Sequence, residues 1–220
     1  MSKINYQRQS GIINIKDFRD NKTAIIGCGA IGSFVGISLA KMGLTKFDLY
    51  DFDKVEAHNL PNQFFGVNDI GKNKAVATAK YMENFNDDVE IETKGKLEKT
   101  SPYLRCQIVI SCVDKMDIRK ILFQKTKEDK STQLFIDTRM AGFEGHIYVV
   151  DMADKEQVKY YESTLFDDKD AVQVRCTERS ILFTVMGIAS LVCNQIIKAF
   201  KGDEIKNYLV LDYIVPQMMG

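Results

Sequence analysis

Short apolar runs recur along the first two thirds of the chain and alternate with longer stretches that have helical periodicity. The runs predict strands over residues 23–27, 46–50, 89–93, 108–112 and 134–137. The longer stretches place their apolar residues on one face and predict helices over residues 31–42, 74–85 and 117–127. Alternating strands and helices at this spacing are typical of a doubly wound α/β fold, so we expect a Rossmann-like, mainly parallel sheet.

The last third of the chain has a different pattern. Residues 146–150 predict a strand with no helix-length crossover before it, so we expect this strand to run antiparallel to its neighbour. Residues 151–175 are rich in Asp, Lys and Tyr and lack clear periodicity, which predicts a long, mobile, crossover-type loop. A long apolar helix over residues 180–200 and a closing strand over residues 208–215 complete the predicted elements.

Length and charge narrow the class of protein. A chain of 220 residues with 45% hydrophobic content can bury one full core, and no repeat or linker divides the sequence. We therefore expect a single domain over residues 1–220, with residues 1–20 as an N-terminal arm. Thirty basic and 30 acidic side chains balance to a formal net charge of zero, which argues against nucleic acid as the partner.

The cysteines and the apolar runs bear on location. Five cysteines, none spaced as CxxC, fit a reduced, cytoplasmic protein with neither a disulfide framework nor a four-cysteine zinc site. No apolar run is expected to approach the roughly 18 residues that a membrane span needs. The polar start of the chain also lacks the apolar core of a signal peptide. We therefore expect a cytoplasmic protein without a membrane segment.

Residues 27–32 match GxGxxG directly after a predicted strand and at the start of a predicted helix. In this setting the glycines allow a tight turn and close approach to phosphate, and the helix N-terminus attracts an anion. The expected nucleotide contacts in this turn are Gly27, Gly29, Ala30, Ile31 and Gly32. Asp51 ends the second predicted strand, where a carboxylate can bond ribose hydroxyls. The fingerprint alone does not distinguish a dinucleotide from ATP.

Four further motifs accompany the glycine turn. They are Tyr6-Gln-Arg8-Gln9, Asp51-Phe-Asp53 continuing to Asn59 and Gln63, Asp69-Ile-Gly71-Lys-Asn-Lys74, and Ser111-Cys-Val-Asp114. Together the five motifs resemble the ThiF/MoeB/HesA family, the bacterial relatives of ubiquitin-activating enzymes. The resemblance runs from about residue 4 to residue 145, with a weaker continuation over residues 176–198.

The resemblance implies an adenylyltransferase that forms homodimers. Such an enzyme uses ATP and Mg²⁺ to activate the C-terminal glycine carboxylate of a ubiquitin-like or sulfur-carrier protein or peptide, and it releases pyrophosphate. The resemblance assigns ribose binding to Asp51, a position near the phosphates to Asn59 and Gln63, and a triphosphate contact to Lys74. Asp53 would support the same site as a neighbouring turn residue.

The resemblance also implies three residues with catalytic roles. Asp114 would handle Mg²⁺ and be required for adenylation, although taken alone it is equally consistent with an N-cap of the next helix. Arg8 corresponds to an arginine that the family inserts from the other subunit of the dimer. Cys176 resembles a cysteine that accepts the activated carboxylate as a thioester or exchanges it with sulfur. The alternative for Cys176 is a partly buried structural cysteine.

Two positions depart from the family pattern. Asn62 stands where the family usually has arginine, with Lys72 or Arg119 as candidate replacements, and Lys115 stands where it usually has asparagine. Two other functions therefore remain open. An NAD(P)-dependent oxidoreductase would explain the glycine turn and Asp51 but would leave Lys74 and Asp114 without a role. A non-catalytic nucleotide-binding subunit of a heterodimer would explain the two departures.

Overall fold

The computed structural model describes residues 4–167, 181–214 and 217–219. An eight-stranded sheet in the order β3-β2-β1-β4-β5-β6-β7-β8 forms its centre. The first five strands in that order are parallel, and the last three add antiparallel pairs. The strands are β1 (Thr23–Ile26), β2 (Lys46–Tyr50), β3 (Glu90–Lys94), β4 (Ile108–Ser111), β5 (Leu134–Ala141), β6 (Glu144–Asp151), β7 (Tyr208–Asp212) and β8 (Gln217–Met219).

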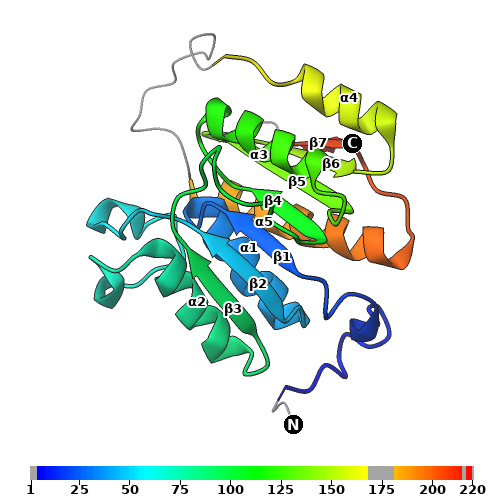
Figure 1. The fold of residues 1–220 in the computed structure, drawn as a ribbon. Helices are drawn as coiled ribbons and strands as arrows, with labels where there is room; N and C mark the ends of the chain where they lie inside the picture. The colour runs from blue at the N-terminus through cyan, green and yellow to red at the C-terminus, as the bar shows by residue number, and fades with distance from the viewer. Residues whose placement is uncertain (1–3, 168–180, 215–216, 220) are drawn as a thin grey trace.

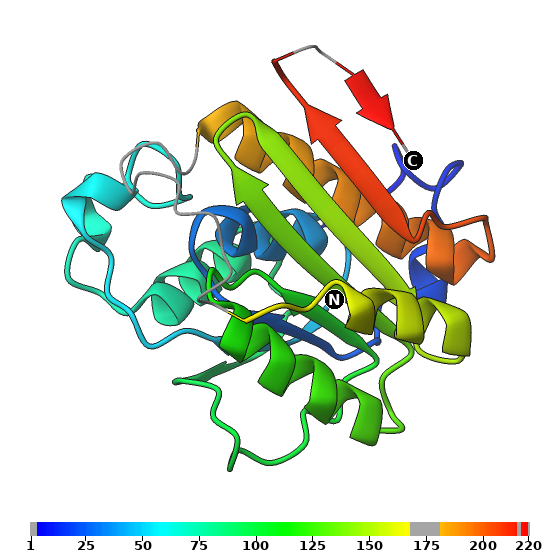
Figure 2. The same cartoon turned by 90° about the horizontal axis from the view of Figure 1, so that it is seen from above.

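Helices cover both faces of the sheet, which confirms the Rossmann-like, mainly parallel class (Figures 1 and 2). One face carries α1 (Ala30–Met42), α2 (Lys74–Phe85) and α5 (Leu182–Lys201). The other face carries α3 (Met116–Glu128) and α4 (Lys155–Ser163). Three short 3-10 turns complete the described elements: η1 (Ile15–Asp17), η2 (Ala57–Asn59) and η3 (Val67–Asp69).

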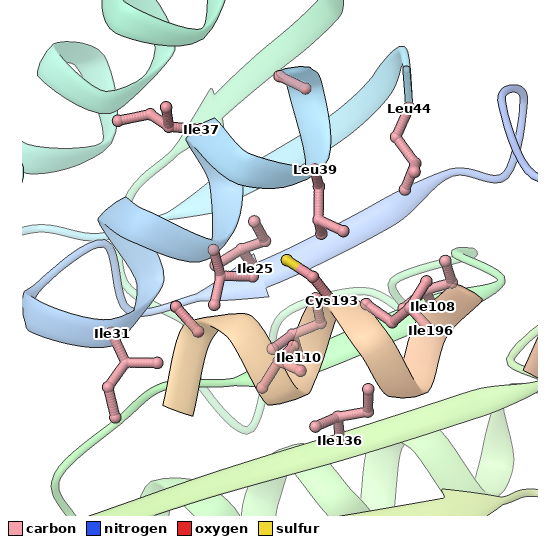
Figure 3. Close-up of a cluster of buried hydrophobic side chains, with 14 of the residues drawn as sticks. Ile25, Ile31, Ile37, Leu39, Leu44, Ile108, Ile110, Ile136, Cys193 and Ile196 are labelled. Carbon is pink, nitrogen blue, oxygen red and sulfur yellow. The ribbon is translucent and has the colours of Figure 1, made fainter. Parts of the chain in front are cut away.

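The central strands are apolar on both faces because helices bury both. All four residues of β1 and all four of β4 are buried, as continuous apolar runs predict for parallel strands. Figure 3 shows Ile25, Ile110 and Ile136 of adjacent strands beneath α1 and α5, with Cys193 and Ile196 projecting from α5. Burying such side chains contributes roughly 1.5–3 kcal/mol each.

The antiparallel extension begins with a tight hairpin between β5 and β6, as the sequence predicted for the strand over residues 146–150. Gly142 in this turn has φ 59°, a backbone region that glycine adopts without strain. The paired register joins Ala141 to Glu144 and Leu134 to Asp151. The prediction of a single closing strand over residues 208–215 is partly wrong, since β7 ends at Asp212 and β8 pairs with it.

The predicted loop over residues 151–175 is wrong in its first half, because α4 occupies part of it. The Asp154 side chain caps this helix by accepting hydrogen bonds from the backbone N–H groups of Glu156 and Gln157. Tyr161, fully buried, anchors the helix against aromatic rings of α3 and β5. The helix was missed because few of its side chains are apolar. Residues 168–175 lie outside the described residues.

The expectation that no apolar segment approaches the length of a membrane span is wrong for α5. This helix of 20 residues contains an 18-residue window with a mean hydropathy of 1.5. Half of that window is buried inside the folded chain, where α5 lies against α1 and the sheet. A core helix with two packed sides is apolar for that reason, so its length and composition are weak evidence for a span.

The N-terminal segment packs at the C-terminal end of α1. The Gln9 side chain donates a hydrogen bond to the Met42 carbonyl at 2.8 Å. The Tyr6 ring lies close to Gly43, which ends α1 with φ 113°. Phe18 is almost fully buried in the main core. This segment is therefore held at the end of α1 that is remote from the glycine turn.

Candidate functional site

The strand order places a topological switch point between β1 and β4. The chain adds β2 and β3 on one side of β1 and then returns to add β4 and β5 on the other side. Ligands of open α/β sheets bind at such a switch point, beyond the carboxyl ends of the strands. The glycine turn follows β1, Asp51 follows β2, and Asp114 comes shortly after β4. The sequence-predicted groups therefore emerge at one edge of the sheet.

The glycine turn has the close contacts that its residue types predict. Gly27 has φ 93°, and a Cβ there would lie 2.7 Å from the Cys112 carbonyl oxygen. A Cβ on Gly32 would lie 1.8 Å from the Gly27 carbonyl oxygen, so this position accepts glycine alone. Gly29 is the N-cap residue of α1, and because it has no side chain it forms no capping hydrogen bond. The first-turn N–H groups, including those of Ala30 and Ile31, are thus available to an anion.

Asp51 joins two loops of the site. Its carboxylate accepts hydrogen bonds from the backbone N–H groups of Cys28 and Asp53, both at 2.8 Å. Burial raises the pKa of Asp51, while these two hydrogen bonds and the nearby Lys74 charge oppose that rise. Asp51 therefore fixes the glycine turn to the loop after β2 in addition to any contact with a ribose.

Lys74 begins α2 and reaches into the same region. Its side chain is only 11% exposed, and its Nζ lies 3.4 Å from the Asp53 carboxylate. Asn73, which the sequence analysis did not single out, organises this corner. It caps α2 by accepting a hydrogen bond from the Val76 N–H, and its Nδ2 donates to the Asp51 and Asp53 carbonyls. Its position immediately before a predicted helix was the available signal.

Asn59 and Gln63 differ in whether their side chains reach the glycine turn. Asn59 is buried, and its Oδ1 accepts a hydrogen bond from the Glu56 N–H, so it caps η2. Gln63 extends toward the glycine turn, with its Nε2 3.9 Å from the position of a Cβ on Gly29. The Gln63 Oε1 is buried and accepts no hydrogen bond from the described residues. Gln63 is therefore the better candidate of the two for a contact with a bound nucleotide.

Asp114 is exposed at the carboxyl edge of the sheet. The residue at the N-cap position of α3 is Lys115, and no side chain of the described residues caps this helix, so the N-cap alternative for Asp114 is excluded. Cys112, two residues before Asp114, donates its backbone N–H to Ile26 and contacts the glycine turn. Asp114 thus stands beside the turn on the β4 side, whereas Lys74 stands on the β2 side.

Arg8 does not join these groups within one chain. It is exposed in the segment that packs at the C-terminal end of α1, whereas the glycine turn lies at the N-terminal end. The 13 residues of α1 separate these ends by about 20 Å. Within one chain Arg8 is therefore remote from Lys74 and Asp114, and its contribution from another subunit stays a prediction.

The two suggested replacements for the missing arginine at Asn62 are occupied elsewhere. Lys72 forms an ion pair with Asp69 at 2.9 Å. Arg119 is buried and bonds the Asp137 carboxylate at 2.9 Å. In this structure both side chains are therefore engaged by carboxylates and not directed at the glycine turn.

Asp69 holds together the loop that precedes α2. Its carboxylate accepts hydrogen bonds from Lys72 Nζ, the Tyr81 hydroxyl and the Gly66 N–H at 2.7–2.9 Å. Burial would raise its pKa, but these three hydrogen bonds outweigh burial and lower the pKa to about 2. Gly71, with φ 88°, then turns the chain toward α2. This loop positions Lys74.

The Asp69 carboxylate should make the free energy of unfolding depend on pH in the acidic range. Its folded pKa lies below its ordinary value of 3.8, so its contribution is present above about pH 4 and is lost as the pH falls toward 2. We expect Asp69→Asn to reduce the free energy of unfolding by about 2 kcal/mol at neutral pH. Urea unfolding of both proteins measures this difference, which should shrink below about pH 4. An equal difference at acidic and neutral pH would contradict the role given to Asp69.

The described cysteines are packing residues. Cys28, Cys106 and Cys193 are buried, and burial raises the pKa of each thiol, to about 12 for Cys106 and Cys193. Raised pKa values keep thiols protonated and unreactive. Cys176 lies outside the described residues. Among the described residues, no three His, Cys, Asp or Glu side chains gather as a metal site.

Comparisons with known proteins agree with this architecture. Curated relatives include ubiquitin-like modifier-activating enzyme 5 of Drosophila simulans, 32% identical over 129 residues, and that of Branchiostoma floridae, 29% identical over 171 residues. The matches cover 51% and 68% of this chain. They span only 32% and 41% of those relatives.

Solved structures share the fold. E. coli MccB with AMPCPP and MccA has a TM-score of 0.74 at 17% identity, and PaaA has a TM-score of 0.71 at 18% identity. Each likeness covers 93% of this chain, and 64% and 73% of the MccB and PaaA chains. The sequence also matches the ThiF family over residues 4–218. With its glycine turn, switch-point crevice and Asp114 loop, the chain belongs to the ThiF family.

Proposed function

We propose that the protein is an ATP-dependent adenylyltransferase that activates the C-terminal glycine carboxylate of a ubiquitin-like or sulfur-carrier protein or peptide. The observation that carries this proposal is the arrangement of charge around the crevice. Lys74 and the uncapped N-terminus of α1 supply positive potential, and Asp114 supplies a carboxylate on the opposite side of the turn. The names of the curated relatives, which are ubiquitin-like modifier-activating enzymes, support the same reaction class.

The residues around the glycine turn fit a nucleoside triphosphate with Mg²⁺. The turn is open at Gly29, where a Cβ would meet only the Gln63 side chain, and the nearest atom there is the Gln63 Nε2, a donor that suits a phosphate oxygen. Mg²⁺ commonly binds one or two protein carboxylates together with phosphates and water. Asp114 would hold it here, and the ion would supply charge neutralisation for the triphosphate.

In the proposed reaction a carboxylate oxygen of the partner attacks the α-phosphorus of ATP. The bond between that phosphorus and the bridging oxygen of pyrophosphate breaks, so the products are an acyl-adenylate and pyrophosphate. The α1 N-terminus and Lys74 stabilise charge that develops on the phosphates during this displacement. The acyl-adenylate then makes the partner's carbonyl carbon open to attack. Transfer to Cys176 is a further step that we propose only as an extension.

Nucleotide preference separates this function from the alternatives. ATP with Mg²⁺ should bind more tightly than NADH in calorimetric titrations. ATP–pyrophosphate exchange should then appear when a small ubiquitin-like protein ending in glycine from the same genome is added. Tighter binding of NADH would favour an oxidoreductase. Metal-dependent ATP binding, with no exchange for any such partner, would favour the non-catalytic subunit.

We further propose that a homodimer completes the site. The N-terminal segment that carries Arg8 also contributes Ile12 to an apolar groove of about 490 Å³ between α1 and α5, which Phe34 and Met186 line as well. Ile12 and Met186 are 70% and 52% exposed, an unfavourable arrangement unless a partner covers them. A second copy of this chain seated on the groove would bring its Arg8 toward a crevice that lacks this cation within one chain.

Mixing two inactive variants tests the shared site. Arg8→Ala and Asp114→Asn should each show little exchange alone. If Arg8 acts on the neighbouring subunit, equal mixing and subunit exchange should restore about one quarter of wild-type activity, because half the dimers then hold one intact site. The measurement is ATP–pyrophosphate exchange before and after mixing. No recovery, with mixed dimers verified by mass, would contradict donation between subunits.

A further inference from the structure

A buried carboxylate near the end of β5 is shared by two arginines. Asp137 has no exposed surface, and its two oxygens accept hydrogen bonds from Arg119 Nε at 2.9 Å and Arg139 Nε at 2.8 Å. Arg119 is 5% exposed, and the Arg139 side chain is 15% exposed. A buried ionic cluster of this kind is weak evidence for stability, because an apolar cluster of equal volume is often as stable. Its presence calls for another role.

Arg119 uses the rest of its guanidinium to hold the loop that carries Asp114. Its Nη1 donates to the Asp114 carbonyl at 3.3 Å, and its Nη2 donates to the carbonyls of Val113 and, at 3.0 Å, Thr138. One planar group therefore joins the main chain just after β4 to the main chain of β5. Arg119 binds the main-chain carbonyl of Asp114 and not its side chain. The Asp114 carboxylate therefore stays exposed.

Arg139 extends the same cluster toward α4. Its Nη1 and Nη2 donate to the carbonyl and hydroxyl oxygens of Thr164 at 3.1 and 2.9 Å. Thr164 is the C-cap of α4. The Arg139 guanidinium also lies 4.4 Å from the centre of the Tyr148 ring. Asp137 thus orients two arginines, one holding the Asp114 loop and the other holding the end of α4.

We propose that Arg119 is a positioning residue for Asp114 and that Asp137 orients Arg119 for this task. The proposal rests on the adenylyltransferase function proposed above. Its physical basis is the fork geometry of arginine, which binds several oxygens in one plane, whereas a lysine ammonium is a point charge. A lysine at residue 119 would retain the ion pair with Asp137 but could not also hold the carbonyls of Val113 and Asp114.

The test compares Arg119→Lys with wild type and with Lys94→Gln. The control is matched because Lys94 also pairs with a buried carboxylate, Asp48, at 2.9 Å but has no link to the Asp114 loop. We expect Arg119→Lys to lower the maximal exchange rate about 100-fold, since small misplacements of reacting groups have effects of that size. It should also raise the Mg²⁺ concentration needed for half-maximal exchange, whereas Lys94→Gln should change neither.

A second readout does not depend on activity. Hydrogen–deuterium exchange of the peptide spanning residues 111–117, measured without nucleotide, should be faster in Arg119→Lys than in wild type or Lys94→Gln. Asp137→Asn, which keeps the size of the side chain, should produce the same local change if Arg119→Lys does not fold. If the hydrogen–deuterium exchange rate of this peptide were the same in a folded variant as in wild type, the proposal would be overturned. If Asp114→Asn also retained activity, the proposed function itself would fail, which is a distinguishable result.

Discussion

Asp114→Asn is expected to lower ATP–pyrophosphate exchange by at least about 100-fold, the scale at which single electrostatic groups act in preorganised sites. Asparagine has the same shape as aspartate but lacks the charge that would hold a divalent cation. The Asp114 side chain is exposed, so the substitution should change the free energy of unfolding by no more than about 0.5 kcal/mol. Exchange kinetics and urea unfolding of the same samples would separate these two effects.

Asp117→Asn provides the matched control. Asp117 is an exposed carboxylate in the first turn of α3, three residues beyond Asp114. Its substitution removes the same charge from the same region but not from the edge beside the glycine turn. Exchange should therefore stay within about threefold of wild type, since an exposed charge that does not touch the bound ligand acts through water, where its interaction is weak. Equal losses in the two variants would indicate a general electrostatic effect and would contradict a specific role for Asp114.

Gly32→Ala is expected to abolish nucleotide binding and to destabilise the fold by about 3 kcal/mol or more, because overpacking against backbone cannot be relieved by a rotamer change. The added Cβ would lie 1.8 Å from the Gly27 carbonyl oxygen. Relief requires α1 to move away from β1, which would also disturb the buried contacts of α1 with the sheet. Thermal unfolding and ATP titration would measure both losses.

Gly29→Ala separates the phosphate cradle from the fold. The added Cβ would meet only the Gln63 side chain, at 3.9 Å, which is an ordinary contact distance. We therefore expect nearly wild-type stability, together with ATP affinity weakened at least about tenfold where the methyl group crowds a bound phosphate. Normal ATP affinity in Gly29→Ala would show that phosphate does not approach this face of the turn.

Most of the fold could be predicted because one local signal determined each element. The continuous apolar runs at β1 and β4 predicted strands buried on both faces, and the glycines around α1 predicted its close approach to β1. The helix α4 escaped prediction because a single buried side chain, Tyr161, anchors it through tertiary packing. Its cap at Asp154 was visible in the sequence but was not supported by a periodic apolar face.

The site was predicted less completely, for a different reason. Motif spacing identified Lys74 and Asp114, but it carried no information on where the side chain of Arg8 ends in three dimensions. Asn73 and Arg119 hold other segments through hydrogen bonds to main-chain oxygens, and Asp137 accepts a hydrogen bond from the Arg119 side chain. Such bonds depend on which groups the fold brings together, so periodicity and composition could not reveal them.

The distance between Arg8 and the glycine turn bears on how the protein would respond to its own abundance. If Arg8 completes the site of a second copy, as we propose, a chain whose arginine sits about 20 Å from its own glycine turn needs that second copy to be active. At dilutions where chains separate, turnover would then rise with the square of protein concentration. The expression level of the protein would then control its activity more steeply than in direct proportion, without an additional regulator.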